Sequence, residues 1–81
     1  MTTEMCVAIV DNVIAGKHGH YAVAHSDRLS SITFSLEPPV WQESDHPEEG
    51  TEVVLSDIRK KRAGWRAMSA RFVRPSDESN Q

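Results

Sequence analysis

Residues 51–73, TEVVLSDIRKKRAGWRAMSARFV, decide how this chain folds, because two different structures fit their pattern. The first five, residues 51–55, are rich in valine and leucine, which is typical of a β-strand. Residues 57–73 fit a strand followed by a turn and a last strand over residues 66–73. Gly64 would lie in the turn, where glycine adopts positive φ without steric cost. They also fit a single helix.

The helical alternative rests on apolar spacing. Four apolar residues follow a period near 3.6, and a serine precedes them in the N-cap position: Ile58, Trp65, Met68, Phe72 and Ser56. Lysine, arginine, alanine and methionine also favour a helix, whereas Gly64 would cost about 1 kcal/mol in a helix interior. The segment by itself leaves both structures open.

The preceding residues favour β-structure. Residues 5–14 are rich in valine and isoleucine and predict a first strand, which the two glycines of residues 16–19 end in a turn. Residues 20–25 predict a second strand, and residues 32–36 alternate apolar and polar side chains, the period of a half-buried strand. Strand signals at such short spacing indicate a small sandwich or barrel, so we expect residues 57–73 to form a hairpin.

A long loop separates the third and fourth predicted strands. Residues 37–50 contain Pro38, Pro39 and Pro47, which lack a backbone donor and fix φ. The loop also holds an acidic cluster without any base: Glu43, Asp45, Glu48 and Glu49. We expect Trp41 in this loop to close one end of the core, because a tryptophan buries a large apolar area.

Charge is strongly polarised along the chain. Residues 59–74 hold seven of the nine basic residues and no acid, so this run carries +7 and the remaining residues carry −10, which the net charge of −3 conceals. Lysine and arginine neutralise phosphates, and an indole ring stacks on a base. The run therefore predicts a polyanion site, and the alternative is a solvated charged hairpin or helix face.

Length and composition bound the class of protein. Eighty-one residues make one small domain, expected over residues 4–75, with a flexible C-terminal tail at residues 76–81. The single cysteine, Cys6, excludes an internal disulfide and is expected to be a small buried hydrophobe in a reducing compartment. No signal peptide and no apolar run near the ~20 residues of a membrane span is present, which predicts a cytoplasmic protein that does not contact the membrane.

Two segments resemble a known family. Residues 47–55 (PEEGTEVVL) resemble the L-x-x-G-x-x-V-x-F pattern that opens the fourth strand of cold-shock domains, and residues 62–73 (RAGWRAMSARFV) resemble their K-G-x-x-A-x-x-V ending. The resemblance covers residues 47–73, one third of the chain. It implies an all-β fold, a small five-stranded barrel of the oligonucleotide-binding (OB) type, that binds RNA or single-stranded DNA.

The first half of the chain departs from that family. Cold-shock domains bind bases through two aromatic motifs similar to K-G-F-G-F-I and V-F-V-H-F, whose counterparts here are residues 17–23 (KHGHYAV) and 32–36 (ITFSL). Lys17, Gly19, His20 and Tyr21 supply part of the first motif. Thr33 and Ser35 stand where the second has an aromatic residue and a histidine, so a full cold-shock binding platform is not implied.

The predicted nucleic-acid site combines the basic hairpin with the first turn and second strand. In an OB barrel the loop between the fourth and fifth strands borders the binding face. Trp65 is expected to be exposed there and to stack on a base, with the basic residues around it contacting phosphates. The predicted binding residues are Lys17, His18, His20, Tyr21, Arg59, Lys60, Lys61, Arg62, Trp65 and Arg66.

Neither catalysis nor a cofactor is predicted. His18 and His20 are two residues apart and would share one face of a strand, but structural zinc requires four ligands with firm spacing, so no metal is expected. His25, Ser26 and Asp27 are adjacent, which is not the geometry of a catalytic triad. No phosphate-binding loop or dinucleotide motif occurs, and so short a chain rarely builds a closed pocket, so an enzyme is not expected.

Two other functions remain open at this stage. The acidic loop and the basic segment could engage a protein partner, since tryptophan and arginine are favoured interface anchors. A basic amphipathic helix over residues 56–72 could instead bind DNA or an anionic membrane. The oligomeric state, and the choice between RNA and DNA, are not predicted.

Overall fold

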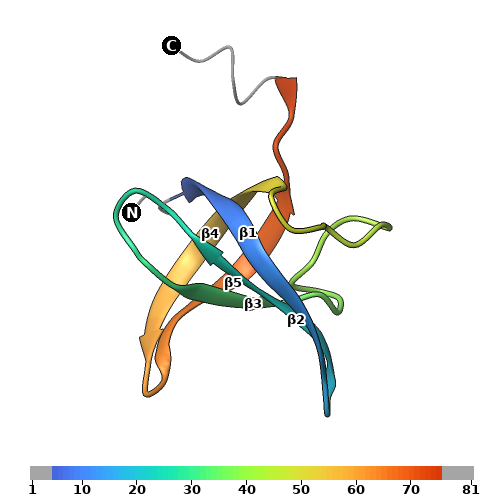
Figure 1. The fold of residues 1–81 in the computed structure, drawn as a ribbon, viewed down its shortest axis with the longest axis horizontal. Coiled ribbons are helices and arrows are strands. Elements are labelled where there is room, and N and C mark those ends of the chain that lie inside the picture. The colour runs from blue at the N-terminus through green and yellow to red at the C-terminus, as the bar shows by residue number, and fades with distance from the viewer. Residues whose placement is uncertain (1–4, 76–81) are drawn as a thin grey trace.

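The computed structural model describes residues 5–75 as five strands that close into a barrel (Figure 1). The strands are β1 (Met5–Gly16), β2 (Gly19–His25), β3 (Ile32–Ser35), β4 (Glu52–Lys61) and β5 (Gly64–Phe72). Their order around the barrel is β1-β2-β3-β5-β4, and β4 pairs with β1 to complete the circle. β3 and β5 run parallel, and the other neighbours are antiparallel.

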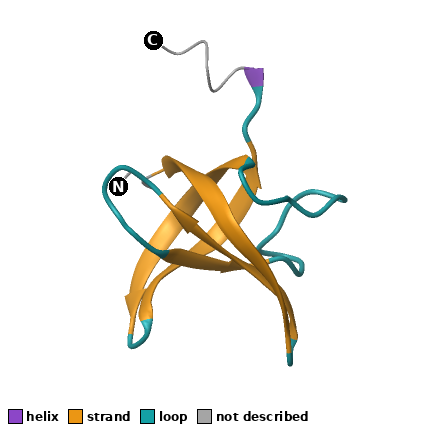
Figure 2. Cartoon of the chain, in the orientation of Figure 1, coloured by secondary structure: helices purple, strands orange, loops and turns teal. Residues whose placement is uncertain are grey.

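This arrangement confirms the prediction of an all-β, five-stranded, OB-like barrel. All five expected strands are present, and loops connect them (Figure 2). Residue 4, the expected start of the domain, and the expected tail at residues 76–81 lie outside the described residues.

Alternation along the strands fills the barrel. In β2 and β3 the buried residues are Ala22, Ala24, Ile32 and Phe34, each separated from the next in its strand by one more accessible residue. Large side chains are combined with alanines on the neighbouring strand: Ala22 pairs with Phe34, and Ala24 with Ile32. A small barrel has room for such a mixture of large and small side chains and for little else.

Trp41 closes one end of the barrel, as predicted. Its ring is 4% exposed and lies 6.0 Å from that of Phe34 and 5.0 Å, edge-on, from that of Phe72. Its Nε1 donates a hydrogen bond of 2.8 Å to the backbone oxygen of Asp45, so the polar tip of the indole is satisfied within the loop. A backbone bridge to Ala70 fixes this part of the loop against β5.

The segment that was ambiguous in sequence forms the β4–β5 hairpin. β4 continues six residues beyond the predicted end at residue 55, and β5 starts at Gly64, two residues before the predicted start. Arg62 and Ala63 make the turn, and Lys61 pairs with Gly64, which has a φ of 129°. The helix over residues 56–72 is wrong.

A kink at Asp57 explains why this hairpin resembled a helix in sequence. Asp57 has a φ of 53° in the middle of β4. Leu55 and Ile58 both pack into the core although they are three residues apart, and the same holds for Ala67 and Ala70 opposite them on β5. In a regular strand every second residue points inward. At one place in each of these strands, two successive inward residues are three positions apart instead of two.

Asp57 provides the first testable prediction. Asp57→Val should lower the free energy of unfolding by about 1–3 kcal/mol, because a β-branched residue tolerates this left-handed backbone poorly. Asp57→Gly removes the same carboxylate but adopts positive φ freely, so it should cost clearly less. Urea denaturation of both variants measures the difference, and equal losses would mean that the carboxylate, not the backbone, matters.

Candidate nucleic-acid interface

The outer face of β3 lies between two projecting hairpins. The β1–β2 hairpin turns at Lys17 and His18, and the β4–β5 hairpin turns at Arg62 and Ala63. Figure 2 shows both hairpin tips extending from the same end of the barrel, with β3 crossing between them. Each turn begins with a cation and is followed by a glycine of positive φ, Gly19 at 121° and Gly64 at 129°.

A groove runs along this face. Its larger part, about 390 Å³, is lined by Gly16, Lys17, His18, Gly19, His20, Tyr21, Thr33, Phe34, Ser35 and Arg66. A smaller hollow of about 90 Å³ is lined by Thr33, Lys61, Ala63, Gly64, Trp65 and Arg66. Thr33 and Arg66 line both, so the groove continues from one hairpin to the other across β3. It brings together seven of the predicted residues: Lys17, His18, His20, Tyr21, Lys61, Trp65 and Arg66.

Cations without an acidic partner surround the groove. Within residues 5–75, the side chains of Lys17, Lys61, Arg62 and Arg66 are exposed, and none forms an ion pair or a hydrogen bond. Arg59 lies directly opposite Arg66 on the neighbouring strand, and like charges in that position are unfavourable. The groove therefore carries positive charge that the described part of the chain leaves largely uncompensated.

Arg59 differs from these four cations because it is paired. Its Nε and Nη2 donate hydrogen bonds of 3.1 and 2.9 Å to the two carboxylate oxygens of Asp57. These hydrogen bonds, together with the negative charge of Asp57, raise the pKa of the Arg59 guanidinium above its usual value. Arg59 stays charged, but its donors are partly occupied within β4.

The acidic loop does not cover the basic hairpin. Figure 1 shows the loop between β3 and β4 on the side of the barrel away from the tip of the β4–β5 hairpin. Glu43 of this loop accepts hydrogen bonds from the backbone nitrogen of Phe72, at 3.3 Å, and from Arg74, at 3.5 Å, both far along the chain from the hairpin tip. The two charged segments, adjacent in sequence, are thus separated in space.

Trp65 is half-buried, so the prediction of an exposed Trp is wrong. Its neighbour in the parallel β3–β5 pair is the core residue Ile32, and its ring packs against the core cluster. The Nζ of Lys60 lies 5.1 Å from the ring centroid, within the range of a cation–π contact. Trp65 lies on the same inward side of β5 as the buried Ala67, and Arg66 between them faces outward.

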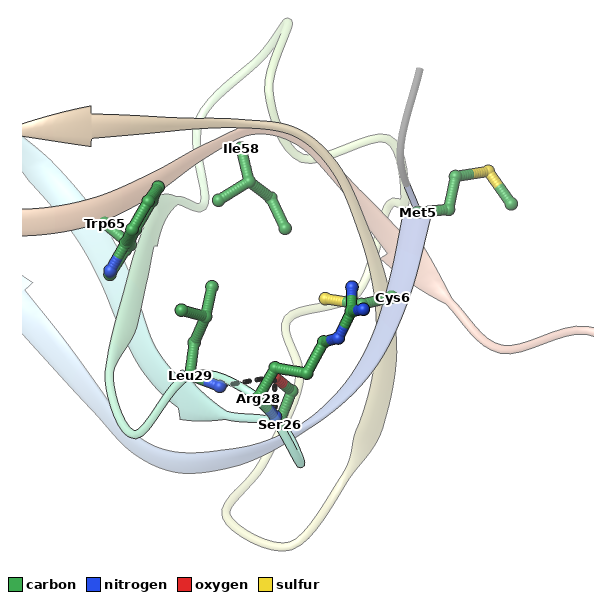
Figure 3. Close-up of a pocket in the computed structure, with 7 residues that line it drawn as sticks. All are labelled: Met5, Cys6, Ser26, Arg28, Leu29, Ile58 and Trp65. Atoms are coloured by element: carbon green, nitrogen blue, oxygen red, sulfur yellow. Dashed lines mark hydrogen bonds between the residues drawn. The ribbon is translucent and has the colours of Figure 1, made fainter. Parts of the chain in front are cut away.

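Figure 3 shows the opening of the barrel that Trp65 borders. Its volume is about 290 Å³, and its lining is Met5, Cys6, Ser26, Arg28, Leu29, Ile58 and Trp65. Cys6 lines this opening and is half-buried, whereas the sequence predicted a buried cysteine. The β2–β3 loop contributes Leu29, whose backbone nitrogen donates to Ser26 Oγ at 3.1 Å.

Tyr21 supplies an aromatic ring to the groove. It starts the pairing of β2 with β3, opposite Ser35. A Cβ atom added to Gly16 would lie 3.0 Å from Tyr21 Cε1, so the missing side chain at Gly16 makes room for the ring. The departure from cold-shock motifs is visible on the same face, where Thr33 and Ser35 are the outward residues of β3.

The histidines lie apart from the shared strand face that their spacing allowed. His18 lies in the turn and His20 on β2, so the two do not share a strand face, and the ring of His20 instead lies 5.2 Å from that of His46. His25 Nδ1 contacts the Asp11 carboxylate at 2.8 Å, a partner that sequence spacing did not indicate. Residues 5–75 contain no group of three or more metal-ligating side chains.

The glycines of the two turns provide a matched pair of variants. A Cβ atom at Gly19 would lie 2.8 Å from Glu37 Cγ, whereas one at Gly64 would meet nothing within 4 Å. Gly64→Ala should therefore cost about 1–3 kcal/mol for the positive φ alone, and Gly19→Ala more. The additional loss of stability in Gly19→Ala should disappear when Glu37→Ala is combined with it. Thermal or urea denaturation measures these losses. An excess that persists would contradict the contact with Glu37.

The fold and the groove define a class, an OB-like barrel with a basic face. No protein-family model, curated protein or solved structure matches the chain. In residues 5–75 there is also no helix of the length and hydropathy needed to cross a membrane.

Proposed function

We propose that this protein is a module that binds single-stranded nucleic acid, RNA or single-stranded DNA, in the groove across β3. One observation carries the proposal: three cations without an acidic partner in residues 5–75, Lys17, Lys61 and Arg66, line a groove that also contains Tyr21, and Arg62 lies in the turn next to Lys61. Phosphates would neutralise the cations, and a base would stack on the ring.

Energetics support an external polyanion as the partner of this charge. Placing Arg59 opposite Arg66 is unfavourable in the isolated chain, and an exposed ion pair such as that of Arg59 with Asp57 compensates it only weakly. A phosphate strand would relieve the repulsion at several cations together. The acidic loop lies on the side of the barrel away from the tip of the β4–β5 hairpin, so screening over about 10 Å weakens its effect on the cations of that hairpin.

The alternative is a non-enzymatic protein-interaction module that uses the acidic loop and the basic patch. The spatial separation of the acidic loop from the basic hairpin supports this alternative. Each charged surface could then bind an oppositely charged surface of a partner or of a second copy. It predicts no response to oligonucleotides and a mass that depends on concentration.

Fluorescence anisotropy of labelled single-stranded RNA and DNA 12-mers, at ~50 and ~200 mM salt, tests the proposal. We expect binding that weakens about 20- to 50-fold over this range, as three to four phosphate contacts to a single strand require. A double-stranded DNA of equal length is the control for general attraction to phosphates. The absence of binding at the lower salt concentration would refute the proposal, and analytical ultracentrifugation would then test the alternative.

A further inference from the structure

We infer that the groove binds the sugar–phosphate backbone with little regard to base identity, and that a single base, stacked on Tyr21, makes the base contribution. This inference rests on the proposed function. It concerns which chemical groups of the strand the protein contacts, and it departs from the aromatic platform that the partial resemblance to cold-shock domains would suggest.

The lining of the groove lacks the amide and carboxylate side chains that pair with base edges. Bases are discriminated by asparagine, glutamine, aspartate and glutamate, and also by arginine or lysine and by serine or threonine hydroxyls. None of the first four lines either part of the groove among residues 5–75, and Arg66 is the one arginine that does. Thr33 Oγ1 already donates to the Trp65 carbonyl at 3.4 Å, and Ser35 Oγ accepts from the Glu37 backbone nitrogen at 3.0 Å.

Stacking surfaces are equally limited. Phe34 is fully buried beneath the groove, and Trp65 packs towards the barrel opening under Lys60. The ring of His20 already lies against that of His46, and His18 belongs to the turn at the rim. Tyr21 is therefore the one phenylalanine, tyrosine or tryptophan of residues 5–75 whose ring lines the groove without belonging to the core cluster or packing against it.

Cations, in contrast, lie at both ends of the groove. Lys17 belongs to the β1–β2 turn, and Lys61 ends β4 on the other side of β3, with Arg66 lining both parts between them. A strand that crosses β3 would meet a cation at each hairpin and one in the middle. Contacts of this kind fix position along the backbone and carry no sequence information.

One carboxylate lies beside the groove without lining it. Glu37 is adjacent to Gly19, and its Oε2 accepts a hydrogen bond of 3.2 Å from the backbone nitrogen of His20. It does not line the groove. Its hydrogen bond to the backbone instead supports the start of β2, where Tyr21 follows.

A double-mutant cycle that combines the protein with a modified strand tests the inference. The strands are oligo(dT), oligo(dC) and an abasic DNA, each of 12 nucleotides, and the proteins are the unmodified chain, Tyr21→Ala and Tyr21→Phe. We expect oligo(dT) and oligo(dC) to bind the unmodified chain within about 5-fold of each other, because the stacking of one base tolerates either sequence. Tyr21→Phe should bind both strands as the unmodified chain does.

Tyr21→Ala should lower the affinity for oligo(dT) by about 5-fold or more, because one stacked base is lost. The affinity for abasic DNA should not change. In this variant oligo(dT) and abasic DNA should bind equally. If Tyr21→Ala still prefers oligo(dT) more than about 5-fold, or weakens abasic DNA equally, the inference is wrong while nucleic-acid binding stands. If no strand binds any of the proteins at low salt, the proposed function itself fails.

Discussion

Replacing Lys61 and Arg66 together by glutamate is expected to lower the affinity for a single-stranded 12-mer about 100-fold at ~50 mM salt. Both residues line the groove, and neither has an acidic partner among residues 5–75. The double reversal removes two cations that would neutralise phosphates and places two repulsive charges beside the strand. The salt dependence should become shallower, by about 0.7 in log–log slope for each phosphate that the variant no longer neutralises.

The matched control is Arg28→Glu with Arg74→Glu, which changes the net charge equally. Arg28 lines the barrel opening, and Arg74 follows β5 beside Glu43. Neither lines the groove, so we expect a loss of less than about 10-fold from long-range charge alone at this ionic strength. Equal losses in the two double variants would show that the overall charge, and not the groove, attracts the strand. Circular dichroism should confirm the β-fold of both.

The second large effect concerns stability. Trp41→Ala is expected to lower the free energy of unfolding by about 3–5 kcal/mol, because it empties the end of the core beside Phe34 and Phe72. A chain of this length has a total stability of roughly 4–12 kcal/mol, so the variant should lose a large fraction of its stability. Urea denaturation followed by far-ultraviolet circular dichroism measures this without depending on tryptophan fluorescence.

Two variants separate the contributions to this loss. Trp41→Phe keeps an aromatic ring but loses the Nε1 hydrogen bond to Asp45, and should cost less than Trp41→Ala. Trp65→Ala removes the same kind of ring from a half-buried position at the opposite opening of the barrel and should also cost less. If Trp65→Ala were as destabilising as Trp41→Ala, the difference in burial between the two rings would be contradicted.

Local patterns were sufficient to predict most of the barrel. Alternating apolar residues marked residues 32–36, and the glycines of residues 16–19 marked the first turn, because both signals depend on a few consecutive residues. The burial of Trp41 followed from its size in a proline-rich loop. The cations of the candidate site were also identified from their density along residues 59–66.

The orientation of those residues could not be predicted in the same way. The left-handed backbone at Asp57 interrupts strict alternation, and an aspartate in a sequence does not by itself indicate that conformation. The direction of every side chain between Asp57 and Gly64 depends on this one residue. Trp65 was expected on the binding face, but in β5 it lies on the same inward side as the buried Ala67, two residues away. The helical alternative arose from the irregular spacing of inward residues.

The sequence by itself determined the number of strands, the hairpin turns and the concentration of positive charge in one segment, because short-range sterics and composition set these features. Closure of the barrel decided the rest. It placed Lys17 and Tyr21 of the first hairpin in one groove with Arg66 of the last, and placed the acidic loop away from the tip of the β4–β5 hairpin. The physical reason is that the parallel pairing of β3 with β5, which joins Ile32 to Trp65 and Thr33 to Arg66, creates the face between the two hairpins, and no local pattern specifies a contact between residues so far apart in sequence.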